Sequence, residues 1–176
     1  MKRSKKRGKV QIDDLVVLMR SLRGPRGCPW DKKQTPESLK TYIIEEAYEL
    51  VEAIEQGKPE KICEELGDLL FQIIFQAQIF SERKKFNLDR VIKTIYQKMI
   101  YRHPHVFGNK KVSTPEQVKE QWVELKKNSQ AKNSVLGEVP KSLPALLRAR
   151  RLTDNASQVG FDWEKTEQVI DKVNEE

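Results

Sequence analysis

Four carboxylates stand in two pairs that share the same spacing. Glu46 and Glu49 are three residues apart, and Glu65 and Asp68 repeat that interval. Residues three apart on a helix lie on one face, so each pair would present two carboxylates within about one turn. An all-oxygen ligand set of this kind suits Mg²⁺ or Mn²⁺ rather than Zn²⁺. The spacing therefore indicates a divalent-cation site, provided that the two segments lie side by side.

The segments that carry these pairs contain acids and no basic residues. Residues 41–56 hold five glutamates without a lysine or arginine, and residues 62–80 hold three acids, again without a cation. Exposed helical glutamates are usually balanced by lysines four residues away, because like charges at that spacing repel. A bound cation would remove the repulsion. The alternative is a solvated acidic face with Gly67 at a tight helix crossing, and the spacing alone leaves both interpretations open.

Helix signals predict how the two pairs are brought together. Thr35 followed by Pro36 is an N-cap with proline at the first helical position, and Gly57 with Pro59 ends the same helix at about residue 56. A second helix is expected from about residue 60 to 83. The short connection makes the two helices antiparallel neighbours, so the four carboxylates would converge. Gly67 would leave room there for a metal, a substrate or the opposing helix.

Further helices are predicted over about residues 13–23, 88–102, 115–128 and 143–152, with a last one from about residue 164. Asn87 is the expected cap of the third long helix, and Asp13 or Asp14 that of the first. Strand-like alternation of Val, Ile and Thr is absent from the sequence. The pattern predicts an all-α fold, a bundle of about four helices.

Composition limits the classes of partner. The 176 residues include 33 Lys and Arg against 26 Asp and Glu, a net charge of +7, but six of the cations lie in the first nine residues. We therefore expect no specific nucleic-acid partner for the folded body. Cys28 and Cys63 are too few for a disulfide framework, and no apolar run of about 18 residues occurs. These features predict a cytoplasmic protein without a membrane partner.

Several motifs, in order, resemble one known family. Glu45-Glu46-Ala47-Tyr48-Glu49 followed by Glu65-Leu66-Gly67-Asp68 is similar to the EExxE and ExxD signature of the MazG family of nucleoside triphosphate pyrophosphohydrolases. The segments 27–32, 34–35, 67–71 and 102–107 also resemble MazG segments. The resemblance covers about residues 12–128, one complete MazG unit.

This resemblance implies an all-α, four-helix-bundle-type MazG fold that is completed by dimerisation, with a homodimer as the expected partner state. It implies hydrolysis of NTPs and dNTPs to a nucleoside monophosphate and pyrophosphate, with Mg²⁺ as cofactor and Mn²⁺ as a possible substitute, in nucleotide-pool house-cleaning. By motif position, Glu46, Glu49, Glu65 and Asp68 are the expected metal ligands. Glu45 is the expected catalytic residue, which orients or deprotonates the attacking water.

The resemblance also suggests substrate-binding residues. Lys98 and Arg102 are four apart and match the family's phosphate-binding stretch, with Lys61 as a weaker candidate. Trp122 lies where the family has a tryptophan near its nucleotide, so it would stack on the base or, alternatively, pack in the core. For Trp30, in the Cys28-Pro29-Trp30-Asp31 loop, we expect a role in anchoring the loop to the bundle.

The predicted organisation is a basic flexible arm at 1–10, the MazG-like domain at 11–128, and a linker with a short helix at 129–161. Residues 162–176 resemble the start of a second unit or form a C-terminal tail. Because copies in two-unit proteins need not be equally active, a second hypothesis stands beside catalysis. It describes a catalytically weak nucleotide-binding and dimerisation module of a two-unit MazG protein.

Overall fold

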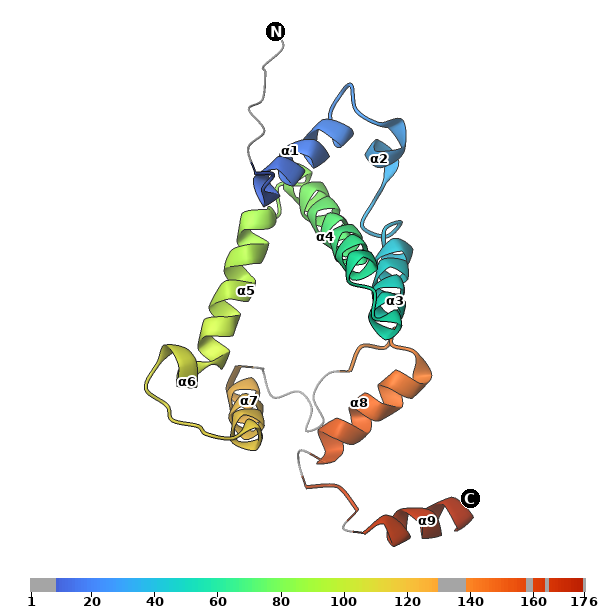
Figure 1. Cartoon of the computed structure of the whole chain (residues 1–176), viewed down its shortest axis with the longest axis vertical. Coiled ribbons are helices and arrows are strands. Elements are labelled where there is room, and N and C mark those ends of the chain that lie inside the picture. Colours follow the sequence, from blue (N-terminus) through green and yellow to red (C-terminus); the bar gives the residue numbers. More distant parts are fainter. Residues whose placement is uncertain (1–8, 130–138, 158–159, 164, 176) are drawn as a thin grey trace. The chain divides into compact units, whose positions relative to one another are not determined.

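The computed structural model describes residues 9–129, 139–157, 160–163 and 165–175 (Figure 1). Across these residues the chain is all-α, as predicted, and contains no strand. The elements are α1 Ile12–Arg23, α2 Pro29–Lys33, α3 Lys40–Gln56, α4 Pro59–Glu82, α5 Leu88–Arg102, α6 Pro104–Phe107, α7 Pro115–Ser129, α8 Ala145–Ser157 and α9 Thr166–Glu175. None of the described helices is long and apolar enough to cross a membrane.

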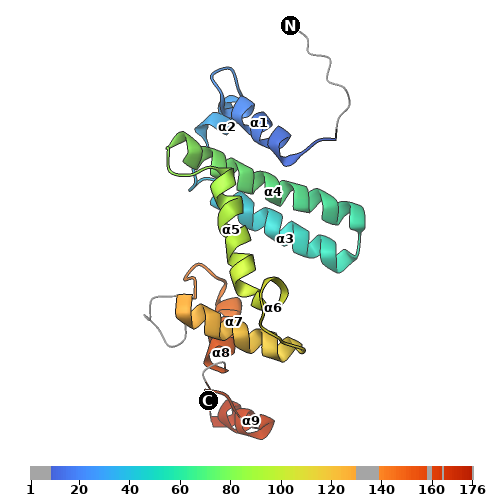
Figure 2. The ribbon, with the colours of Figure 1, turned by 90° about the vertical axis from the view of Figure 1, so that its left-hand side faces the viewer.

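The chain divides into two compact units, Met1–Met99 and Ile100–Glu176. The first unit is built on the hairpin of α3 and α4, which lie side by side in both views (Figure 2), and α1 packs on α4. The predicted antiparallel pairing of the two acidic helices is thus confirmed. Gly57 closes α3 in the left-handed conformation, with φ +64°, which glycine adopts without a steric penalty.

The core of the first unit lies where α1 meets the C-terminal half of α4. Its buried members come from α1, the turn before α3, α4 and the start of α5: Met19, Leu39, Ile74, Phe75, Ala77, Ile79 and Leu88. The apolar residues of α4 therefore concentrate in its second half, whereas its first half carries the acids. This division leaves the first half of α4 free for a polar site.

The starts of α3 and α1 differ from the predicted ones in detail, whereas the start of α5 agrees with its prediction. Thr35 caps the turn before α3 as predicted, because Thr35 and Ser38 form the reciprocal hydrogen bonds of a capping box at 2.9 and 3.2 Å. Regular α3 nevertheless begins at Lys40 rather than Pro36, since Lys40 N donates to the Glu37 carbonyl at 3.3 Å. At α1 the cap position is Gln11, and the Gln11 backbone N–H donates to the Asp14 carboxylate at 3.0 Å. Asn87 caps α5 as predicted, through Arg90 N at 3.1 Å.

The second unit has a small packed centre around Trp122 of α7. The Trp122 indole N–H donates to the Arg102 carbonyl at 2.9 Å, and the His103 ring lies edge-on to it at 5.3 Å. Gln121 is buried, and its Nε2 lies 3.2 Å from His105 Nδ1. These contacts tie α7 to the residues that follow α5.

Candidate metal centre

Three of the four predicted metal ligands converge. One carboxylate oxygen from each of Glu46, Glu49 and Glu65 lies within 4.8 Å of the others, in the groove between α3 and α4. Among the described residues, this is the group of three or more acidic, histidine or cysteine side chains that comes close enough to hold a metal ion. The three-residue spacing on α3 supplies two of the carboxylates, and the helical hairpin supplies the third.

Asp68, the fourth predicted ligand, lies near enough to act on this cluster electrostatically. Burial is the largest cause of a raised pKa at Glu46. The negative charges of Asp68, Glu49 and Glu65 raise that pKa further, and a hydrogen bond from Gln72 opposes the rise. A divalent cation among these groups would replace their mutual repulsion by attraction, which lowers the pKa of each ligand.

Glu65 provides the observation that fits a cation best. Its side chain is 1% exposed, and its Oε2 atom has no hydrogen-bond partner among the described residues. A buried, unpaired carboxylate oxygen is costly unless it binds something positive. An all-oxygen ligand set with one such orphaned oxygen suits a hard divalent cation such as Mg²⁺.

Lys61 lies at the edge of the same groove. Its Nζ atom is 2.6 Å from Glu65 Oε1 and 3.3 Å from Glu64 Oε2, and hydrogen bonds to these two carboxylates raise the pKa of Lys61. Lys61 therefore neutralises part of the acidic charge in this structure. A hollow of about 310 Å³ adjoins it, lined by Glu49, Glu52, Ala53, Gln56, Lys61 and Glu65.

The remaining predicted residues lie outside the carboxylate cluster. Glu45 is exposed on α3, next to Glu46 in the chain, and Lys98 is exposed on α5. Arg102 is half-buried and ends α5, with its carbonyl bonded to Trp122. Trp122 is itself half-buried in the packed centre of the second unit.

Gly67 is not in close contact with the opposing helix, which was one interpretation of the sequence. A Cβ atom built at Gly67 meets nothing within 4 Å, so neither α3 nor any other described part of the chain requires glycine there. The expectation of a tight approach by the opposing helix is wrong. Gly67 leaves open space beside the first half of α4.

Sequence reasoning also missed two neighbours of the site. Gln72 of α4 forms the hydrogen bond that opposes the raised pKa of Glu46, and Glu52 lines the adjacent hollow. Helical spacing could have indicated both residues. Gln72 lies four residues after Asp68, and Glu52 lies three residues after Glu49.

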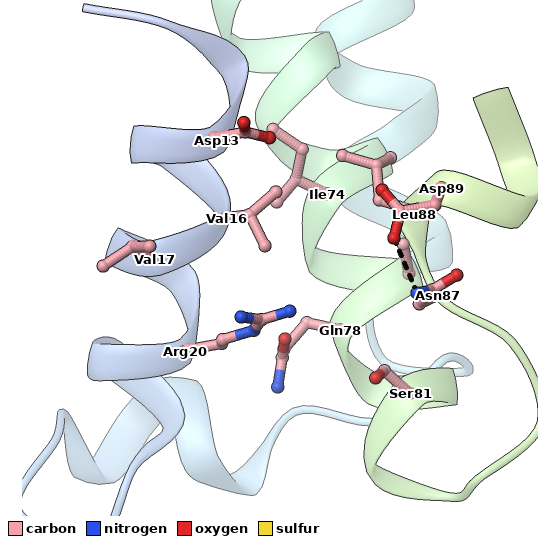
Figure 3. A pocket seen from close by; sticks show the side chains of 11 residues that line it. Asp13, Val16, Val17, Arg20, Ile74, Gln78, Ser81, Asn87, Leu88 and Asp89 are labelled. Atoms are coloured by element: carbon pink, nitrogen blue, oxygen red, sulfur yellow. Dashed lines mark hydrogen bonds between the residues drawn. The ribbon is translucent and has the colours of Figure 1, made fainter.

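A second hollow, of about 190 Å³, lies between α1, the C-terminal half of α4 and the start of α5 (Figure 3). Arg20 of α1 and Gln78 of α4 extend toward each other across it, and Asn87 is bonded to Asp89 at 2.9 Å. Its two acids, Asp13 and Asp89, are accompanied by Arg20 and apolar side chains. This mixed lining lacks the convergent carboxylates of the α3–α4 groove.

Fold and site together define a class: an all-α protein with a carboxylate cluster, between two antiparallel helices, that could hold a metal ion. Residues 34–107 match the family model described as the MazG nucleotide pyrophosphohydrolase domain. These residues therefore carry the sequence of a MazG domain.

Relatives cover nearly the whole chain. It is 48% identical, over 95% of its length, to the nucleoside triphosphate pyrophosphohydrolase/pyrophosphatase MazG of Thermotoga maritima. It is 41% identical, over 94% of its length, to the nucleoside triphosphate pyrophosphohydrolase of Escherichia coli. The chain spans 65% of the length of each of these two proteins. A crystal structure of a mazG-related protein from Thermotoga maritima matches 66% of the chain and 99% of that protein, with a TM-score of 0.56 and 29% identity.

Proposed function

We propose that this chain hydrolyses nucleoside and deoxynucleoside triphosphates to a monophosphate and pyrophosphate, with Mg²⁺ as its cofactor, in nucleotide-pool house-cleaning. The observation that carries the proposal is the convergence of Glu46, Glu49 and Glu65 around a buried, unpartnered oxygen. The names of the two curated relatives support the same reaction.

The charges explain why a cation is needed. A triphosphate carries about four negative charges near neutral pH and would be repelled by a bare carboxylate cluster. Bound there, Mg²⁺ would supply the positive charge that offsets this repulsion and stabilises the charge that develops on the leaving pyrophosphate. Glu46, Glu49, Glu65 and Asp68 hold the cation in this proposal.

The other predicted residues act on the water and the phosphates. Glu45 accepts a proton from the water whose oxygen bonds to phosphorus, while the α-β phosphoanhydride bond breaks and pyrophosphate leaves. Lys98 and Arg102 bind phosphate oxygens. Lys61, which contacts Glu65 in this structure, would bind a phosphate oxygen of the substrate.

A second copy of the chain is the partner that fits this fold. Ile44, Tyr48 and Val51 recur at helical spacing on α3 and are 50–55% exposed, and Ile54 is 57% exposed. A row of large apolar side chains on one helix face is costly in water. A homodimer that packs these α3 faces together would bury them and complete a four-helix bundle.

Substitution of single ligands tests the proposed site. Glu49→Ala and Asp68→Ala should each reduce turnover at least a hundredfold while circular dichroism and oligomeric state stay unchanged. Glu55→Ala, an exposed acid on the same helix outside the cluster, is the matched control and should keep full activity. Full pyrophosphate release by the Glu49 variant would refute the metal site. Loss of activity in all three variants alike would assign the effect to the stability of the α3–α4 hairpin.

A further inference from the structure

Lys61 lies between two carboxylates of α4 that differ in burial. Its Nζ atom is 2.6 Å from Glu65 Oε1 and 3.3 Å from Glu64 Oε2. The Glu65 side chain is 1% exposed, whereas that of Glu64 is 62% exposed and that of Lys61 is 46% exposed. The intervals of three and four residues place all three side chains on one helix face. One partly solvated ammonium group therefore reaches a buried carboxylate and an exposed one.

In the metal-free protein, Lys61 balances part of a buried negative charge. Glu65 is the buried member of the carboxylate cluster, and oxygens of Glu46 and Glu49 lie within 4.8 Å of its own. Within the described part of the chain, Lys61 is the basic residue that forms an ion pair with this cluster. Removal of one partner from a buried ion pair is strongly destabilising, because it leaves a charge without compensation. Lys61 should therefore stabilise the fold as long as no metal ion is bound.

A divalent cation at the cluster would compete with the Lys61 ammonium group for the same carboxylate. Both are positive, so they repel each other at short range, and both are attracted by Glu65. Lys61 has an alternative position, because its side chain is flexible and the exposed Glu64 carboxylate is already 3.3 Å away. The hollow of about 310 Å³ beside Lys61 provides space for the movement. Lys61 can thus leave Glu65 and still keep an ion pair.

We propose that Lys61 is a positioning residue for Glu65: it holds the buried carboxylate in the metal-free protein and competes with the divalent cation for it. The inference rests on the proposed function, because it requires a cation at the cluster. It predicts that Lys61 raises the stability of the metal-free chain and lowers the affinity of the cluster for metal. A lysine that served only to bind substrate phosphates would do neither in the absence of substrate.

Lys61→Met tests both effects, because it keeps an unbranched apolar side chain and removes the charge. In EDTA, the unfolding temperature of the variant should fall below that of the wild type, since Glu65 loses its partner. Calorimetric titration with Mn²⁺, without nucleotide, should show binding tighter by about twofold to fivefold, the worth of a half-exposed ion pair. The two effects have opposite signs. General damage to the fold would lower the stability and the metal affinity together.

Two further variants separate the position of Lys61 from its charge. Lys58→Met makes the same substitution three residues earlier, at an exposed position outside the hollow, and should leave both properties close to those of the wild type. Lys61→Arg keeps the positive charge and should restore most of the metal-free stability and the wild-type Mn²⁺ affinity. Equal effects of Lys58→Met and Lys61→Met would assign them to net charge and overturn the inference.

The possible failures are distinguishable. Mn²⁺ affinity that is unchanged or weaker in Lys61→Met would show that Lys61 does not compete for Glu65. An unchanged unfolding temperature in EDTA would show that Lys61 does not hold the buried carboxylate. Wild-type chain that binds no Mn²⁺ would overturn the proposed metal site itself, and this inference with it.

Nuclear magnetic resonance gives a readout that keeps Lys61 in place. In chain labelled with ¹³C at the lysine Cε atoms, the Lys61 signal is the one that Lys61→Met lacks. Saturating Mg²⁺ should shift this signal, because the ammonium group leaves Glu65, and should leave the Lys58 signal unchanged. A Lys61 signal that does not respond to bound Mg²⁺ would contradict the competition.

Discussion

At the scale of single residues, the proposed metal site depends most on Glu65. It is the buried member of the cluster, and its Oε2 atom lacks a partner among the described residues, whereas Glu49 is exposed. Lys61 pairs with Glu65 Oε1 but leaves Oε2 without a partner among the described residues, so a buried ionised carboxylate is only partly compensated here. The same residue should therefore limit the stability of the metal-free protein and provide much of its affinity for the metal.

Glu65→Gln tests this dual role, because it keeps the side-chain shape and removes the charge. Without metal, the unfolding temperature should stay equal to that of the wild type or rise. The increase in unfolding temperature that Mg²⁺ causes in the wild type should disappear. Differential scanning calorimetry with Mg²⁺ and with EDTA measures both effects.

Glu64→Gln is the control for that variant, since Glu64 also contacts Lys61 but is 62% exposed. It should keep the stabilisation by Mg²⁺. A Glu65→Gln protein that Mg²⁺ still stabilises as strongly as the wild type would show that Glu65 is not a ligand.

Glu82 determines a pH dependence that is independent of the metal site. Hydrogen bonds from Arg23 lower the pKa of Glu82 below its ordinary value of 4.5. A carboxyl with a lowered folded-state pKa stabilises the protein above 4.5, and this contribution is lost as the pH falls through the folded-state value. Because Glu82 is 37% exposed, solvent screens the pair.

Glu82→Gln should therefore be less stable than the wild type at neutral pH, by at most about 1 kcal/mol. The difference should shrink as the pH is lowered from 6 to 3. Urea unfolding across that pH range measures it. A difference that is constant with pH would mean that the ionisation of Glu82 plays no part.

At the scale of elements, Gly67 lowers the stability of α4 but leaves open space beside the helix. Glycine in the interior of a helix costs about 1 kcal/mol relative to alanine, and a Cβ at this position meets nothing within 4 Å. The chain by itself thus gains nothing from this glycine. A substrate or a second copy that approaches the first half of α4 would explain why the space is left open.

Gly67→Ala should raise the free energy of unfolding by about 1 kcal/mol and lower turnover. Gly57→Ala is the contrast, because Gly57 has equal space but a φ of +64°, so that variant should be destabilised. Chemical unfolding and pyrophosphate release report the two properties. A Gly67 variant with unchanged turnover would show that the open space has no role in catalysis.

The helices themselves were largely predictable because their end signals are local. Asn87 before α5 and Gly57 after α3 act on neighbouring backbone groups, so the sequence shows them directly. The start of α3 was predictable only in its cap: Thr35 caps the turn, but the Lys40 N–H donates to the Glu37 carbonyl, so the regular helix begins later. The role of Arg23 depends on Glu82, 59 residues away, and only the folded chain brings them together.

The site was predictable where spacing determines it and not where packing does. The interval of three from Glu46 to Glu49 places both on one helix face in any helix. The burial of Glu65 and the exposure of Trp30 depend on how α4 and α2 pack, and residue spacing does not predict that packing. The same holds for Gly67, whose expected close contact the structure does not show.

At the scale of the whole molecule, the apolar residues of α3 predict self-association. Ile54→Lys places a charge in the proposed interface, where Ile54 is 57% exposed, and should shift the chain from dimer toward monomer. Val10→Lys, at a residue that is 75% exposed before α1, should leave the dimer intact. Sedimentation velocity over a range of concentrations distinguishes them. A wild-type chain that sediments as a monomer at all concentrations would contradict the proposed dimer.

The most direct test of the central claim is product analysis of the wild-type chain. The chain is incubated with each common NTP and dNTP, with Mg²⁺, Mn²⁺ or EDTA, and the products are separated by anion-exchange chromatography. Monophosphate and pyrophosphate in equal amounts, formed with metal and absent with EDTA, are the predicted result. Diphosphate with inorganic phosphate would contradict the proposed bond, and absence of product with either metal would contradict catalysis by this chain.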